Sequence, residues 1–375
     1  MLEPLLLGSG NLIASIIGGL FWLGLASIVT ATTYGEMNYY IAAATLASGL
    51  SIAGLNFTTT TYLAKGFEKI VGQANVVVLI LGSISAIILA IIINHIPAAL
   101  LVLALSSFLM TGAEFLGRKR YKAFSILIIS NRSAQVIVSL GLYYLFGIDG
   151  IILGYALTSL VFSYPFFRSI RSASLSFEEI KRRMRFSLHS YSEPVSLTIA
   201  TNADKLLIAP IFGFEILGLY HLGFQFLMFL SVIPASLNQY LLPQEASGIE
   251  RKGIRTFGLV LSIVLAVILF FTLPLIIEQF FPKYTEGTSL AQLLILGVIP
   301  ITMNSLMNTR LLGKEKSKIV VIGSAVYISS LLFLLYVLGN HFGLFGLGMA
   351  VIISSSIQYA TLWMLNNVHR KSYNH

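Results

Sequence analysis

Residues 168–185 read RSIRSASLSFEEIKRRMR and form the longest polar run in this chain of 375 residues. Six of these residues are Arg or Lys, whereas the sequence on either side is apolar enough to lie in lipid. The run therefore indicates a basic cytoplasmic linker between two membrane-embedded halves of similar size. We place the N-terminal half at residues 1–167, the linker at 168–186 and the C-terminal half at 187–375.

The composition is that of a membrane protein. Hydrophobic residues make up 56% of the chain and charged residues only 10%, against about 25% in an average soluble domain. The mean hydropathy is +0.86. The apolar runs are continuous over about 20 residues, which suits a membrane-spanning helix and is longer than the alternating strands of a membrane β-barrel. We therefore expect an all-α polytopic membrane protein.

The apolar runs predict about twelve transmembrane helices, six in each half. Those of the N-terminal half lie at roughly 7–30, 37–60, 72–94, 97–117, 122–146 and 148–167. Those of the C-terminal half lie at roughly 187–211, 215–240, 255–279, 287–309, 318–339 and 343–366. Because six is an even number, the two halves share one orientation. They would then be related by pseudo-two-fold symmetry about the membrane normal.

The basic residues lie almost entirely on one side of these predicted spans. Of the 24 Lys and Arg residues, 21 fall on one side, Lys283 falls on the other, and Arg132 and Lys205 fall inside spans. Since cytoplasmic loops carry the excess of Lys and Arg, we expect the linker and the C-terminus to be cytoplasmic in a multi-pass protein of the cell membrane. Glu3, with no basic residue before the first span, departs from this pattern, and one explanation is a start upstream of Met1.

The two halves show a weak internal repeat. The stretch 116–122 (LGRKRYK) resembles 312–318 (LGKEKSK), and 146–150 (FGIDG) resembles 342–346 (FGLFG). Both pairs are separated by 196 residues. The equal separation requires equal spacing across a whole span in each half. It therefore supports two halves of parallel topology, which in transporters usually enclose a substrate site between them.

Several short motifs resemble those of a known family. The stretch 34–40 (YGEMNYY) follows the first span, Asp204-Lys205 precedes Gly218-Leu219-Tyr220, and 281–284 (FPKY) and 312–314 (LGK) follow the ninth and tenth spans. In order and spacing these motifs resemble the O-antigen (Wzx-type) polysaccharide flippases of the multidrug/oligosaccharidyl-lipid/polysaccharide exporter superfamily. The chain departs from that family at 27–30 (SIVT), where an Arg is often present, so no first-span charge can be carried over.

The resemblance implies a transporter rather than an enzyme. Such flippases move a polyprenyl-linked oligosaccharide, a polysaccharide precursor, from the cytoplasmic to the outer leaflet. The implied partners are the lipid-linked oligosaccharide, membrane lipids and other membrane proteins of polysaccharide assembly.

Several classes of chemistry are disfavoured. The chain has no cysteine, and its six histidines show no metal-ligand spacing, so we expect no metal. No G-x-x-x-x-G-K-[ST] motif is present, so we expect neither a nucleotide motor nor another cofactor. The net charge of +9 is explained by membrane topology, and we expect no nucleic acid partner. Transport would draw on a gradient or on consumption of the cargo outside.

Charged side chains at membrane depth are costly, and they mark candidate cavity residues. Arg132 lies ten residues into the fifth predicted span, with Gln135 about one turn further on the same face. A guanidinium suits phosphate geometry, so Arg132 is a candidate contact for the phosphate of the cargo. The alternative is a structural pair with Glu114, which lies near the cytoplasmic end of the fourth span. For Glu114 itself, simple hydration at the helix end is the leading interpretation.

Asp204 and Lys205 lie in the outer half of the seventh predicted span. Adjacent side chains point about 100° apart on a helix, so we expect that the two do not fully satisfy one another and that each has a partner on another helix. Lys205 is close enough to the span exit to reach outward to the membrane surface. For Asp204 two interpretations are equally supported: a role in cation or proton coupling, and a structural contact between helices.

Three other functions compete with a flippase. A cation-coupled drug or small-molecule antiporter of the same superfamily would favour acidic residues in the cavity, whereas the deepest charge here is Arg132. A membrane-embedded polysaccharide polymerase or ligase would need clustered acids in a sizeable polar domain, and no long outer loop is predicted. A scaffold without transport activity would have little use for buried charges.

Overall fold

The computed structural model describes residues 2–171, 173 and 176–372. Helices occupy almost all of these residues, and no strand occurs among them. The predicted all-α class is therefore confirmed. Two compact units make up the chain: unit 1 contains Met1–Trp22 and Tyr39–Thr198, and unit 2 contains Leu23–Asn38 and Ile199–His375.

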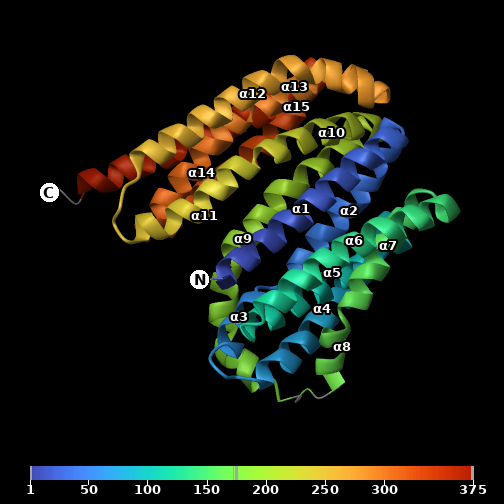
Figure 1. Cartoon of the computed structure of the whole chain (residues 1–375), viewed down its shortest axis with the longest axis vertical. Coiled ribbons are helices and arrows are strands. Elements are labelled where there is room, and N and C mark those ends of the chain that lie inside the picture. Colours follow the sequence, from blue (N-terminus) through green and yellow to red (C-terminus); the bar gives the residue numbers. More distant parts are fainter. Residues whose placement is uncertain (1, 172, 174–175, 373–375) are drawn as a thin grey trace. The chain divides into compact units, whose positions relative to one another are not determined.

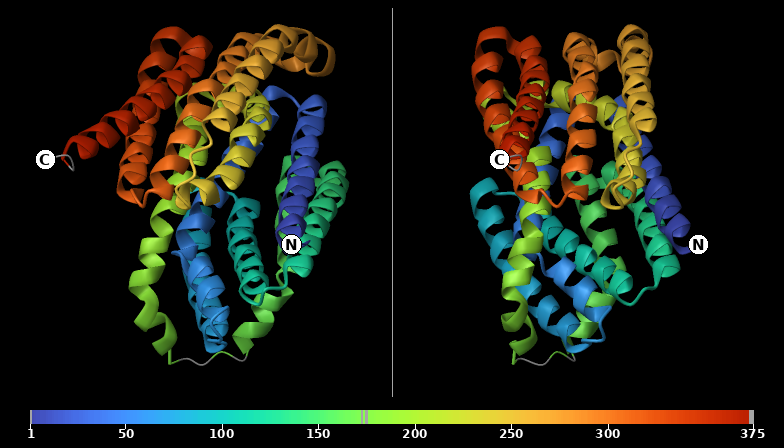
Figure 2. Two further views of the ribbon diagram at one scale, coloured as in Figure 1. Left: turned by 60° about the vertical axis from the view of Figure 1, so that its left-hand side comes forward. Right: turned by 90° about the vertical axis from the view of Figure 1, so that its left-hand side faces the viewer.

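Three helices contribute residues to both units. They are α1 (Leu2–Ile28), α2 (Ala31–Ile52) and α9 (Glu178–Phe212). The α9 helix begins inside the predicted linker and is continuous over 35 residues, through the seventh predicted span. Figure 2 shows α8 and the first part of α9, coloured green, at the same end of unit 1.

Unit 1 is built around α5. Its further helices are α3 (Leu55–Leu63), α4 (Lys69–Ile93), α5 (Ile96–Gly117), α6 (Tyr121–Phe146), α7 (Ile148–Phe162) and α8 (Tyr164–Arg171). In Figure 1 they surround α5, which packs against each of the other five. The buried face of α5 is rich in Ala, Ser and Gly, and such small side chains let helices approach closely in lipid.

One turn of unit 1 is held by a side-chain cluster. His95 precedes α5, and its Nδ1 accepts a hydrogen bond from the Ala98 amide at 3.1 Å. Its Nε2 lies 3.0 Å from Asp149 Oδ1 at the start of α7, and its ring stacks on Tyr40 with the centroids 3.7 Å apart. The cluster therefore ties the α4–α5 turn to the α6–α7 turn.

Unit 2 has its own set of packed helices. They are α10 (Phe214–Leu230), α11 (Val232–Ala246), α12 (Lys252–Phe280), the 3-10 helix η1 (Pro282–Gly287), α13 (Thr288–Leu296), α14 (Val298–Gly313) and α15 (Ser317–Ser372). Here α14 packs on α11, α12 and α15, and α10 packs on α13. The first turn of α2 crosses α10 closely, because a Cβ at Gly35 would lie 1.8 Å from the Phe214 carbonyl oxygen.

Eight helical segments of the described chain are long and apolar enough to cross a membrane, and ten are if each of two bent pairs is one span. The bent pairs are α2 with α3 and α7 with α8. One of the eight segments lies in α15 and contains both of the last two predicted spans, which are separated at Gly343 by non-helical φ and ψ of 56° and −134°. The seventh predicted span lies in α9, where Asp204 and Lys205 lower the hydropathy.

The internal repeat extends to the backbone. Gly147 and Gly343, 196 residues apart, break their helices with nearly identical angles: φ is 60° and 56°, and ψ is −138° and −134°. Lys119 and Glu315, also 196 residues apart, both have positive φ, at 57° and 59°. At each of these residues the backbone amide donates to the carbonyl three residues earlier. The corresponding turns of the two units therefore share one backbone conformation.

Candidate functional site

A polar face on α6 surrounds Arg132, which lies about 16 Å from the start of this 26-residue helix. Its Nη1 donates to Gln135 Oε1 at 2.7 Å, one turn further along α6. The same nitrogen lies 3.5 Å from the Tyr155 hydroxyl of α7, and the guanidinium carbon lies 5.5 Å from the Tyr155 ring centroid. The guanidinium is thus oriented by an amide and an aromatic ring rather than by a carboxylate.

Two amide groups beside Arg132 have unused hydrogen-bond donors. Gln135 is 1% exposed and Asn131 is 3% exposed. Neither Gln135 Nε2 nor Asn131 Nδ2 has a hydrogen-bond partner among the described residues. Buried donors without an acceptor are costly and uncommon in folded proteins. The α6 donor face, which we define as Asn131, Arg132 and Gln135, is therefore suited to a ligand that accepts hydrogen bonds.

Sequence reasoning identified Arg132 and Gln135 but missed Asn131 and Tyr155. Asn131 lies four residues before Gln135, which is the helical spacing that places two side chains on one face. That signal was available in the sequence. Tyr155 could not be found in the same way, because it lies on α7 and meets Arg132 only through the packing of α6 on α7.

Glu114 has a different partner from the one considered for it. Its Oε1 accepts from Arg118 Nε at 2.9 Å, and Arg118 Nη1 also lies 2.9 Å from a carboxylate oxygen of Glu68. The pair with Arg132 is therefore not formed. The Glu114 side chain is only 15% exposed, and its Oε2 is buried without a hydrogen-bond partner among the described residues. Glu114 belongs to a charged cluster at the end of α5, apart from the α6 donor face.

In unit 2, Asp204 and Lys205 form a buried ion pair. Lys205 Nζ lies 3.2 Å from Asp204 Oδ1, and the same oxygen accepts from the Lys205 backbone amide at 2.8 Å. Lys205 Nζ also donates to the carbonyl of Thr201, one turn earlier, and lies 4.5 Å from the Phe224 ring centroid. The side chains are 1% and 5% exposed.

One expectation for this pair was wrong, because Lys205 does not reach outward. The two residues contact one another, and each also has a partner on α10: Tyr220 for Asp204 and the Phe224 ring for Lys205. The reason is that the lysine side chain folds back along its own helix, so that its ammonium lies over the preceding turn beside Asp204. The expected interhelical partner of Asp204 does exist: the Tyr220 hydroxyl on α10 donates to its Oδ2 at 2.8 Å. Both carboxylate oxygens are therefore hydrogen-bonded.

The motifs that looked separate in the sequence meet in unit 2. Tyr220 of the Gly218-Leu219-Tyr220 motif bonds to Asp204, and the next residue, His221, has its ring centroid 5.3 Å from that of Tyr34. Tyr34 in turn lies edge-on to Tyr284, with the centroids 6.1 Å apart. Lys283 Nζ donates to the Ile28 carbonyl at the end of α1 at 2.8 Å. Four motifs thus build one packed polar cluster.

The predicted site residues fall into three groups. Arg132 and Gln135 lie together on α6, Glu114 lies in the charged cluster at the end of α5, and Asp204 and Lys205 lie in unit 2. The first group can donate hydrogen bonds to an anion or to sugar hydroxyls. At the last group, any external cation must compete with the tethered ammonium of Lys205. No group of side chains in the described chain has the composition and spacing of a metal site.

The chain is similar in fold to structures of membrane exporters and in part of its sequence to one protein family. The sequence model of a family described as polysaccharide biosynthesis protein matches residues 94–251. The inward closed structure of the lipid II flippase MurJ is 15% identical, with a TM-score of 0.75 over 97% of this chain and 87% of that one. Among the curated proteins no match is found.

Two drug transporter structures are similar as well. The inward-facing structure of a multidrug resistance MATE family transporter of the MOP superfamily is 14% identical, with a TM-score of 0.72 over 96% of this chain and 95% of that one. The outward-facing structure of such a transporter has 14% identity and a TM-score of 0.62, covering 99% and 96%. This chain therefore has the polytopic, all-helical fold of these exporters.

Proposed function

We propose that this protein is a transporter that flips a polyprenyl-linked oligosaccharide from the cytoplasmic to the outer leaflet by alternating access. The observation that carries the proposal is the α6 donor face, where a guanidinium lies beside two amide donors without acceptors. The shared fold with a lipid II flippase and the match to a polysaccharide biosynthesis family support the same cargo class.

The cargo chemistry explains why such a face is needed. A phosphate or diphosphate on the lipid must cross about 30 Å of hydrocarbon. Moving an isolated anion from water into that medium costs on the order of tens of kcal/mol by Born solvation, unless the anion is paired. A guanidinium can bind two phosphate oxygens at once, and amide donors can bind others or the sugar hydroxyls. Arg132, Asn131 and Gln135 supply that set near mid-depth.

A second candidate, export of an organic cation, is favoured by one observation, the buried carboxylate of Asp204. A cationic drug would need that carboxylate, and the MATE transporters share the fold. However, Lys205 and Tyr220 already bind both of its oxygens. A cation would have to displace an ammonium that is held by its own chain, so we rank this function second.

Transport by purified protein in sealed vesicles separates the two functions. One set of vesicles carries a fluorescent polyprenyl diphosphate-linked oligosaccharide, and delivery to the opposite leaflet is read by a membrane-impermeant quencher. A second set is loaded for uptake of the fluorescent cation ethidium. We expect flipping of the lipid-linked sugar above protein-free vesicles and no ethidium transport. Ethidium transport without flipping would contradict the proposal.

A further inference from the structure

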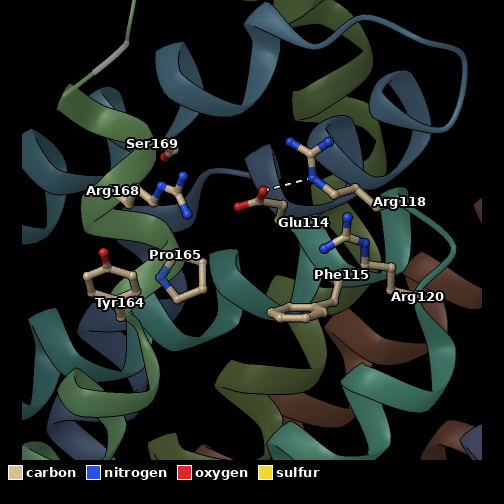
Figure 3. A pocket seen from close by; sticks show the side chains of 8 residues that line it. All are labelled: Glu114, Phe115, Arg118, Arg120, Tyr164, Pro165, Arg168 and Ser169. Atoms are coloured by element: carbon tan, nitrogen blue, oxygen red, sulfur yellow. Dashed lines mark hydrogen bonds and ion pairs between the residues drawn. The ribbon is translucent and has the colours of Figure 1, made fainter.

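A pocket of about 400 Å³ lies at the end of unit 1 where α5, α6 and α8 meet. Pockets of roughly 300–1,000 Å³ hold small ligands. Three guanidinium groups line it: those of Arg118 at the end of α5, Arg120 before α6 and Arg168 on α8. Figure 3 shows Arg168 on one side of the pocket and Arg118 and Arg120 on the other.

The charges in this pocket are unbalanced. Glu114 is its only lining carboxylate, and it is bound to Arg118. Arg118 is also bound to Glu68, so its position is fixed from two sides. No ion pair joins Arg120 or Arg168 to another side chain in the described chain. These two guanidinium groups therefore have capacity for an external anion.

The helix that carries Arg168 is held firmly in place. Phe166 is 1% exposed and packs in a hydrophobic cluster with Leu55, Val78 and Met110. The Ser169 hydroxyl accepts from Asn75 Nδ2 on α4 at 2.6 Å and donates to the Phe166 carbonyl at 2.8 Å. Because α8 is anchored on both sides of Arg168, the pocket is a built site rather than a chance meeting of surface side chains.

The pocket has an apolar side next to its basic side. Phe115, Pro165 and Tyr164 line it, and Tyr164 is 66% exposed. Aromatic residues of this kind gather at the membrane–water interface, where one part of a ligand is wet and the other lies in lipid. Arginine is the side chain best matched to phosphate oxygens. Together these features suit a phosphate group attached to a hydrocarbon chain.

We propose that this pocket binds the phosphate or diphosphate headgroup of a membrane lipid, with Arg120 and Arg168 as the contacts and Glu114 positioning Arg118. The ligand chemistry has two sources, a polyprenyl diphosphate and an anionic bilayer phospholipid. The site itself does not depend on the proposed transport. Only its use as an entry point for the cargo rests on that function, because the pocket lies apart from the α6 donor face.

Binding to the detergent-purified full-length chain tests the site. The probe is farnesyl diphosphate, measured by calorimetry, with farnesol and inorganic diphosphate as the two halves of the ligand. The pocket variant combines Arg120→Gln with Arg168→Gln. The matched control combines Lys119→Gln with Arg171→Gln, which removes the same charge from the same two exposed segments but outside the pocket lining.

We expect farnesyl diphosphate to bind the pocket variant about tenfold or more weakly than wild type, since charge-assisted hydrogen bonds are lost. The control should change by less than about twofold, because screened charges at a distance contribute little. Equal binding by the pocket variant and wild type would overturn the site. Equal weakening in both variants would also overturn it, by showing a diffuse charge effect. Thermal unfolding of both variants verifies that they are folded.

Competition identifies the source of the headgroup. If phosphatidylglycerol in mixed micelles fails to displace farnesyl diphosphate, the site is selective for polyprenyl lipids. If phosphatidylglycerol displaces farnesyl diphosphate equally well, the site holds anionic phospholipids, and the shared phosphate chemistry still stands. Binding of inorganic diphosphate with no binding of either lipid would refute a lipid site. A protein that binds these lipids but does not flip the cargo would refute only the proposed transport.

Discussion

Arg132 uses little of its hydrogen-bonding capacity within the protein. A guanidinium group carries five N–H donors. Both hydrogen bonds of Arg132 to described residues are made by one nitrogen, Nη1. On the same helix, the amide nitrogens of Asn131 and Gln135 have no hydrogen-bond partner among the described residues. Gly18 of α1 lies close by, because a Cβ there would be 3.9 Å from Arg132 Nε. These features favour a ligand contact over a purely structural role.

We predict that Arg132→Ala lowers flipping of the lipid-linked oligosaccharide at least about tenfold, because the anion loses its charged partner. Arg132→Lys should recover part of the activity, since the charge remains but bidentate binding does not. Tyr155→Phe is the control, because it keeps the ring over which the guanidinium lies and removes only a 3.5 Å contact. The measurement is initial flipping rate per folded protein. Wild-type flipping by Arg132→Ala would leave Arg132 without a part in transport.

Asp204 is predicted to have a separable structural role. Asp204→Asn leaves the ammonium of Lys205 buried without its counter-charge, and breaking such a pair costs roughly 3–5 kcal/mol. We therefore expect a loss of thermal stability and of membrane yield. Combining Asp204→Asn with Lys205→Met removes both charges and should restore most of the stability.

The same variants test whether Asp204 couples transport to an ion gradient. If Asp204 couples transport to an ion gradient, the Asp204→Asn, Lys205→Met protein should be stable yet should flip at a rate that no longer responds to an imposed gradient. A stable double variant with normal gradient dependence would assign Asp204 to structure alone. The double variant is needed because the single change confounds lost stability with lost coupling.

At the scale of the helix, two glycines show how the repeat is enforced. A Cβ on Gly150 would lie 2.1 Å from the Leu142 carbonyl oxygen, and a Cβ on Gly346 would lie 1.9 Å from that of Leu338. Gly346 lies 196 residues after Gly150, and Leu338 lies 196 residues after Leu142. Each glycine permits a helix to fold back tightly on the one before it, immediately after the break at Gly147 or Gly343.

We predict that Gly150→Ala and Gly346→Ala each lower stability by about 1–3 kcal/mol, the usual cost of overpacking, because backbone must move to admit the methyl group. Gly141→Ala is the matched control on α6, since nothing lies within 4 Å of a Cβ there. Unfolding midpoints in detergent provide the measurement. If Gly150→Ala and Gly141→Ala behave alike, the close helix crossing does not limit stability.

The sequence predicted the helices better than the contacts between side chains. Apolar runs and the paired turns specify where helices start and stop, because these depend on local hydropathy and on glycine. The partner of Lys205 depends on side-chain torsions. The partner of Arg118 depends on how the α3–α4 turn meets α5. Neither contact leaves a periodic pattern in the sequence. The resemblance of Tyr34 and Tyr220 to a family pattern was visible, but the contacts of Tyr220 with Asp204 and of Tyr34 with His221 required the fold.

At the scale of the whole molecule, contacts within each unit agree with the topology that the charges predict. In unit 1, Arg118 and Arg120 of one predicted cytoplasmic turn share a pocket with Arg168 of the linker, and His95 and Asp149 join two turns predicted to be outside. In unit 2, Glu250 of the α11–α12 turn pairs with Arg310 of α14 and with Lys314 directly after that helix. Segments assigned to one side of the membrane therefore touch one another.

Topology is the final prediction, and it rests on 21 of 24 basic residues lying on one predicted side. The chain has no cysteine, so single cysteines can be labelled without a background from the protein. In intact cells a membrane-impermeant maleimide should label Glu286→Cys, because this exposed residue adjoins Lys283 on the predicted outer side. Arg182→Cys, at a side chain that is 73% exposed, should react only after permeabilisation. Labelling of Arg182→Cys in intact cells would place the linker outside. A phosphate site beside Arg168 could not then receive a cargo lipid from the cytoplasmic leaflet, whereas the expected pattern places that site in the leaflet where transport would begin.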